Sequence, residues 1–265
     1  MDSDDAAPTL GIRPLSARSV VLSVLLGTHP PRLPISALIA LGEAFGLAPG
    51  TVRTAVSRMV SAGELVPTDS GYALTGRLLE RQREQDVGRT PAEWEWNGEW
   101  RVVTNLTPSR TSAERREFRT AMEGAKLGEL RPDTWMRPTN LPLGCQRAGI
   151  IVTRGALDPT GSRELAQILW DLPALERRAR DLLDALDDIA AQLTADPGGE
   201  GIAPGFTVLA ACLRFLRVEP QLPQEVAGTG SAERLRAQYP VVEGALQQRL
   251  GELFRAARST PRSDQ

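Results

Sequence analysis

The chain has 265 residues, of which 41% are hydrophobic and 24% charged, so it is long enough for two or three domains with cores of their own. Its apolar stretches, such as residues 20–26, are too short to cross a bilayer, and the acidic start at residues 1–5 lacks the cationic region of a signal peptide. Cys145 and Cys212 form no redox or metal-binding motif, so we expect a cytoplasmic protein without metal or cofactor.

The net charge of −2 conceals a basic N-terminal region. Between residues 11 and 83 there are eight arginines and only four acidic residues, whereas acidic residues gather before this region and at positions such as Asp181 and Asp188. A local excess of positive charge is what a domain that contacts phosphates needs, whatever the charge of the whole chain.

Residues 1–11 are acidic and small and predict a disordered tail, and residues 12–88 predict the first domain. Within it, residues 35–41 carry a helical apolar stripe, Gly46 allows a sharp turn, and Pro49 begins a second helix. One face of that helix is apolar at Val52, Ala55, Val56, Met59 and Val60, the spacing of a buried face. The segment predicts a helix-turn-helix.

The opposite face of this second helix has no acidic residue. It carries Gly50, Thr51, Arg53, Thr54, Ser57, Arg58 and Ser61. Small hydroxyl side chains allow close approach to a major groove, while Arg53 and Arg58 reach guanine edges or phosphates. Residues 65–68 and 72–75, joined by Asp69-Ser70-Gly71, predict a two-stranded wing that contacts DNA through Ser70 and Tyr72. The alternative is a helical hairpin with a solvated outer face.

Residues 93–170 mix strand and helix patterns. Residues 100–106 predict a strand and 112–126 an amphipathic helix, followed by extended pieces near Trp135 and at 150–153 and a helix from about Ser162. This order suggests a ferredoxin-like α/β domain. Residues 171–258 predict a mainly helical C-terminal domain, interrupted at residues 196–199 and at Pro220-Gln-Leu-Pro223. The predicted fold class is therefore α+β, with three domains.

Several segments, in this order along the chain, resemble the PaaX family of phenylacetate-catabolism repressors. They are Phe45-Gly-Leu47, residues 51–60, Gly63-Glu-Leu65, residues 72–75, Trp96–Trp100, 116–138, Trp170-Asp-Leu172 and Pro220–Pro223. The resemblance implies the three domains, a homodimer that represses a catabolic or secondary-metabolic operon, and release by an acyl-CoA thioester such as phenylacetyl-CoA. It places DNA recognition at Thr51, Arg53, Thr54, Ser57 and Arg58. The chain departs from the family at the less basic wing turn and after Pro223.

Trp135 and Trp170 have two interpretations. Either they pack in the core and between domains, or they line an aromatic effector pocket between domains. In the second case the phosphates of a CoA would meet arginines, for which the candidates are Arg137, Arg147, Arg214 and Arg217. Ion pairing at the surface explains these arginines equally well. A C-terminal stripe at Leu235, Tyr239, Val242, Leu246 and Leu250 is either a dimer face or core.

The sequence therefore predicts a transcriptional regulator and not an enzyme. A dimer would set two recognition helices in successive major grooves of a palindromic operator, about 34 Å apart. One alternative is a metal-dependent nuclease built on the ferredoxin-like domain, but residues 100–106 offer Asn105 and no Asp. The other is an adaptor whose winged helix binds protein. His29 is the only histidine, and no other His or Cys is expected to join it in a catalytic dyad.

Overall fold

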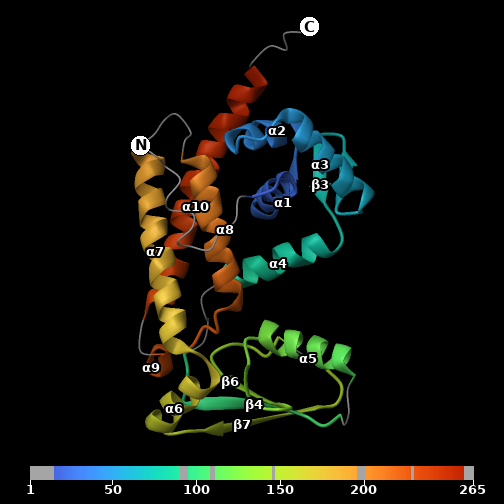
Figure 1. Cartoon of the computed structure of the whole chain (residues 1–265). Helices are drawn as coiled ribbons and strands as arrows, with labels where there is room; N and C mark the ends of the chain where they lie inside the picture. Colours follow the sequence, from blue (N-terminus) through green and yellow to red (C-terminus); the bar gives the residue numbers. More distant parts are fainter. Residues whose placement is uncertain are drawn as a thin grey trace. The chain divides into compact units, whose positions relative to one another are not determined.

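Figure 1 shows the fold of a computed structural model of the chain. The structure describes residues 15–89, 95–107, 111–144, 147–195, 201–227 and 230–259. The predicted tail at 1–11, Cys145 and the loop at 196–199 lie outside these residues. Helices and two small antiparallel sheets confirm the α+β class. No helix in the described residues is long and apolar enough to cross a membrane.

The chain divides into two compact units. Unit 1 comprises Met1–Gly88, Asp181–Leu213 and Ala237–Gln265, and unit 2 comprises Arg89–Arg180 and Arg214–Arg236. Three long helices, α7 (Leu172–Ala195), α8 (Ile202–Val218) and α10 (Ser231–Ser259), contribute residues to both units. The break between α8 and the short α9 (Gln224–Ala227) falls at Pro220–Pro223, as the sequence predicts. The division into domains at 12–88, 93–170 and 171–258 stays a prediction.

The N-terminal part of unit 1 is a small winged helix-turn-helix. Its helices are α1 (Ala17–Gly27), α2 (Ile35–Ala44) and α3 (Pro49–Ser61), and its strands are β1 (Arg32–Leu33), β2 (Leu65–Thr68) and β3 (Gly71–Leu74). Ser16 begins α1 by accepting a hydrogen bond from the Ser19 backbone N–H, and α1 supplies the core with Val20, Val21 and Leu25, none of them exposed. The core therefore forms around α1.

The wing has three strands in the order β1-β3-β2, which corrects the predicted two-stranded hairpin. Arg32 pairs with Ala73 and Leu33 with Tyr72, so the chain segment before α2 returns to the edge of the hairpin. A further helix that the sequence analysis did not predict, α4 (Arg77–Arg89), follows the wing. Its Gln82 is buried and donates hydrogen bonds to the carbonyls of Leu26 and Thr28 at 2.9 and 3.1 Å, which ties α4 to the end of α1.

Unit 2 contains a four-stranded antiparallel sheet in the order β5-β6-β4-β7. Its strands are β4 (Glu99–Asn105), β5 (Gly128–Arg131), β6 (Thr134–Pro138) and β7 (Ile150–Ala156), and its helices are α5 (Ser112–Gly124) and α6 (Pro159–Leu169). The chain forms no helix in the described residues between β6 and β7, and α6 follows the fourth strand. This strand order is the one expected of a ferredoxin-like sheet.

The two faces of the sheet bury different clusters because side chains alternate along β4. Val103 packs with Phe118, Met122, Leu127 and Trp135 beneath α5. Trp100, on the other face, packs with Ala166 of α6 and Val226 of α9. Helix α5 begins with a capping box, in which the Thr111 hydroxyl accepts from the Glu114 backbone N–H and the Glu114 carboxylate accepts from the Thr111 N–H.

Candidate nucleic-acid interface

Helix α3 separates an apolar and a polar face as its sequence predicts. Val52, Val56 and Met59 are at most 1% exposed, so this face is buried in unit 1. The predicted DNA-contacting residues Thr51, Arg53, Thr54, Ser57 and Arg58 are all exposed. Helix α3 contains no acidic residue, so its outer face consists of hydroxyl and guanidinium groups. Two hydroxyls bond back into the helix, with Thr54 donating to the Gly50 carbonyl at 2.9 Å and Ser61 to the Ser57 carbonyl at 3.1 Å.

The angular positions on α3 place the two arginines on either side of the hydroxyl groups. At 3.6 residues per turn, Arg53 and Arg58 point about 140° apart around the helix axis. Thr54, Ser57 and Ser61 lie within the arc between them. A helix of this kind presents short side chains at the centre of its outer face and long cationic side chains at both borders. That is the shape that fits a major groove between two phosphate backbones.

The orientation of α3 is set by contacts at both of its ends. Near its start, Gly42 of α2 packs so close to Val52 that a Cβ added at Gly42 would lie under 3.0 Å from Val52 Cγ2. After its end, Arg18 of α1 holds the Glu64 carboxylate with two donors, of which Nε donates to Oε2 at 3.0 Å. This pair raises the pKa of Arg18, and it balances the acidic side chain that follows α3.

The wing register decides which of its residues face outward. Residues directly paired across antiparallel strands share a face, so Arg32, Ala73 and Val66 lie on the outer side. Ser70 is exposed in the turn, but Tyr72 is half-buried on the inner side, the side to which Leu74 points. Exposed Arg32 is therefore a wing residue that the sequence analysis missed. Its short strand carries no periodic signal.

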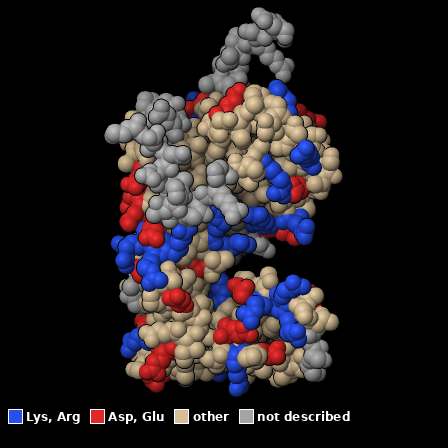
Figure 2. Space-filling view, viewed as in Figure 1, with Lys and Arg blue, Asp and Glu red and all other residues tan. Residues whose placement is uncertain are grey.

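Arginine side chains gather on this part of unit 1. Figure 2 shows Lys and Arg side chains over α3 and over α4 on the face in view. On α4 the exposed residues Arg77, Arg81 and Arg83 follow directly after the wing. The exposed arginines of the candidate interface thus extend beyond α3 to α4.

The residues predicted to bind an effector do not come together. Trp135 is 3% exposed beneath α5, where the Arg119 guanidinium lies 5.5 Å from its ring centroid. Half-buried Trp170 stacks on Trp100, with ring centroids 6.4 Å apart, on the opposite face of the sheet. The two indoles are therefore separated by the sheet itself.

The predicted arginines differ in burial and in their contacts. Arg137 is 1% exposed and donates to the carbonyls of Ala125 (2.9 Å) and Pro138 (3.1 Å), and burial lowers its pKa to about 10. Arg147 pairs with Glu117, whereas Arg214 and Arg217 lie exposed on α8. Carbonyl bonding and surface pairing account for Arg137 and Arg147. The five stripe residues from Leu235 to Leu250 are at most 7% exposed, so that stripe is core within this chain.

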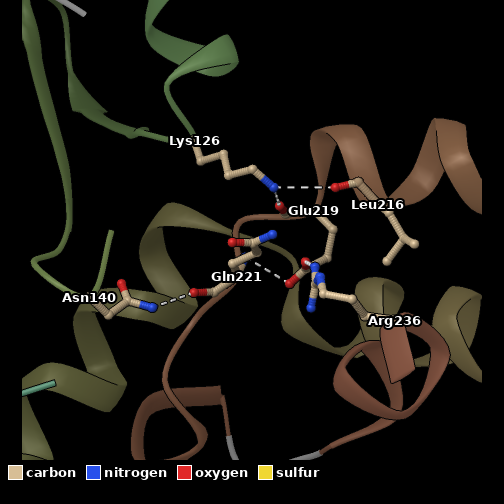
Figure 3. Close-up of polar contacts among 6 residues, drawn as sticks. All are labelled: Lys126, Asn140, Leu216, Glu219, Gln221 and Arg236. Carbon is tan, nitrogen blue, oxygen red and sulfur yellow. Dashed lines mark hydrogen bonds and ion pairs between the residues drawn. The ribbon is translucent and has the colours of Figure 1, made fainter. Parts of the chain in front are cut away.

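Unit 2 contains a buried polar cluster that the sequence did not indicate (Figure 3). The ammonium of Lys126 donates to the carbonyls of Leu216 (3.2 Å) and Glu219 (2.7 Å) at the end of α8. The Glu219 carboxylate accepts from the Gln221 backbone N–H at 2.8 Å and from Arg236 at 2.5 Å. Burial lowers the pKa of Lys126 to about 8, although Glu219 opposes the shift. The only signal in the sequence was that Lys126 is the single lysine.

In the described part of the chain, no group of three or more His, Cys, Asp or Glu side chains lies close enough together to hold a metal ion. Asn105, at the end of β4, donates to the Asp133 carboxylate at 2.6 Å. The pair holds the β5–β6 turn, where Asp133 has a φ of 63°.

A family model described as PaaX-like protein matches residues 16–78, which span the winged helix. The chain is also similar to a solved structure, the uncharacterized protein Rv0674 from Mycobacterium tuberculosis, with 37% sequence identity and a TM-score of 0.72. The match covers 90% of this chain and 98% of the Rv0674 chain. No curated protein matches the chain.

Proposed function

Because the chain belongs to the PaaX-like family, whose members are generally transcriptional regulators, we propose that it is a repressor that binds duplex DNA through α3 and the wing. The observation that carries this proposal is the outer face of α3, which is exposed, free of acidic residues and bordered by Arg53 and Arg58. A solvated surface helix usually carries charges of both signs, so this composition favours a polyanionic partner.

In the proposed mode of binding, α3 enters the major groove and the wing follows the adjacent backbone. Thr54 and Ser57 are short enough to let the helix approach base edges, while Arg53 and Arg58 reach outward to bases or phosphates. Arg32 and Ser70 supply further backbone contacts from the wing. The close packing of Gly42 on Val52 and the Arg18–Glu64 pair hold α3 in position, which lowers the entropy lost on binding.

The proposal includes a homodimer on a palindromic operator and control by a small ligand. Two copies would present their α3 helices to half-sites about 34 Å apart. An acyl-CoA effector is implied by the family resemblance. Trp135 and Trp170, the two aromatic residues predicted for it, lie on opposite faces of the sheet in unit 2, so they do not line one effector site.

Selection of sheared genomic DNA by the purified protein, followed by sequencing, would identify the operator. Its affinity should then be measured by fluorescence anisotropy across a range of salt concentrations. The variant Arg53→Ala/Arg58→Ala should lose the preference for the operator and, if both side chains contact phosphates, reduce the salt slope by about 1.8.

The matched control is Arg163→Ala/Arg177→Ala, which removes two exposed arginines of unit 2 and the same charge. This variant should bind the operator like the parent protein. Equal loss of affinity in both variants would show that binding follows net charge, and an unchanged affinity in the α3 variant would refute the assignment of α3.

A further inference from the structure

Unit 2 has an open cavity of about 780 Å³ at the corner where α6 ends and α7 begins. The last turn of α6, Trp170, the first turn of α7 and Ala227 of α9 line it. Its volume lies within the range of pockets that hold small organic ligands. No residue predicted from the sequence to bind DNA lies there, so the cavity is separate from the proposed interface.

One wall of the cavity is apolar and firmly supported. Ile168, Leu169, Trp170 and Pro173 form this wall, and Ile168 is 68% exposed. Trp170 is held from behind, because it stacks on Trp100 and because a Cβ added at Gly128 would lie only 3.0 Å from its ring. These contacts restrain the indole, and a preformed wall of this kind favours binding of an aromatic or aliphatic group.

The polar groups of the cavity make it electronegative. Asp171 and Glu176 line it, and no described lining residue is Lys or Arg. The C-terminal end of α6 and the N-terminal end of α7 both face it, so the opposite ends of their helix dipoles offset one another and the two carboxylates set the charge of the cavity.

Existing contacts leave Asp171 as the main free charge. Glu176 already accepts hydrogen bonds from Arg180 (3.1 Å) and from the Ser231 hydroxyl (2.5 Å). Asp171 caps α7, with its Oδ1 accepting from the Ala174 backbone N–H at 2.9 Å, and it is exposed. Among the described residues, none of the ion pairs involves the Asp171 carboxylate. Its second oxygen therefore remains available to a cationic ligand.

We propose that this cavity binds a small organic cation with an aromatic or aliphatic body, an arylalkyl amine being the simplest case. The apolar part would lie on Ile168 and Trp170, and the ammonium would meet the Asp171 carboxylate. A polyphosphate such as CoA would meet negative potential here. Binding of the amine is independent of the proposed function, whereas a role for it as effector rests on that function.

The test compares probes with the same aromatic body and with head groups that are cationic, neutral or anionic. Phenethylamine, 2-phenylethanol and 3-phenylpropanoate share the ring and the two-carbon linker, and their binding to the full chain without DNA would be measured by calorimetry. Phenethylamine should bind about fivefold more tightly than 3-phenylpropanoate, the ratio expected of a partly exposed ion pair. Because no DNA is present, failure of the DNA-binding proposal would not affect the result.

Two variants test the site itself. Asp171→Asn keeps an oxygen for the α7 cap and should remove most of the fivefold preference, while Ile168→Arg places a cation at the rim and should abolish amine binding. Asp184→Asn, an exposed carboxylate elsewhere on α7, is the matched control and should change nothing. Equal affinity for the three probes, absence of saturable phenethylamine binding, or an unchanged preference in Asp171→Asn would overturn the proposal.

Discussion

Substitution of Gly42 by alanine tests whether close packing of α2 on α3 positions the recognition helix. The added Cβ would lie under 3.0 Å from Cγ2 of Val52, whereas carbon atoms in contact are about 3.5–4.0 Å apart. Val52 is completely buried, so α2 or α3 must move. Overpacking of this kind costs about 1–3 kcal/mol, and the higher helix propensity of alanine offsets about 1 kcal/mol. We expect Gly42→Ala to destabilise the protein by about 1 kcal/mol.

The effect of Gly42→Ala on stability should change sign when Val52 is replaced by the shorter alanine. Val52→Ala alone removes two buried methyl groups and should cost about 2 kcal/mol. In that background the nearest atoms to the new Cβ at Gly42 are the Cβ atoms at positions 52 and 47, at 3.7 and 3.8 Å, which is ordinary contact. Gly42→Ala should then stabilise by about 1 kcal/mol, so the coupling energy between the two sites is about 2 kcal/mol.

Urea unfolding followed by circular dichroism would measure the four stabilities of this double-mutant cycle. Gly50→Ala is the control, because a Cβ at that position of α3 meets nothing within 4 Å. Operator affinity should fall in Gly42→Ala and recover partly in the double variant. An equal effect of Gly42→Ala in both backgrounds would refute the packing argument.

Two further predictions concern Lys126 and the wing. Lys126 has a pKa of about 8 in the folded protein and 10.5 in the unfolded chain. Between pH 8 and 10.5 the unfolded chain therefore binds more protons than the folded protein, so the free energy of unfolding should rise by about 3 kcal/mol across this range. Urea unfolding across this range should show the rise in the parent protein and not in Lys126→Met; equal profiles would contradict it. Arg32→Ala should lower the salt slope of operator binding by about 0.9 while leaving sequence preference intact, and an unchanged slope would exclude a phosphate contact.

Local patterns determined much of this fold. The apolar spacing of α3 predicts its buried face, because Val52, Val56 and Met59 recur with the helical period and lie buried in the structure. The polar face follows from the same period. Likewise, the strand at β4 and the break at Pro220–Pro223 are visible in a few neighbouring residues, since backbone restrictions and side-chain alternation act over short distances.

Tertiary structure alone decided the features that join distant residues. Strand β1 has only two residues, and it forms because it pairs with β3, some forty positions later. No periodic pattern in the sequence therefore predicts it. Trp135 and Trp170 are equivalent candidates in the sequence, but the sheet register sets them on opposite faces. Lys126 reaches the carbonyls of Leu216 and Glu219, about ninety residues away, and its low pKa results from burial among them. Pairing register and burial depend on the whole fold, which a local sequence pattern does not contain.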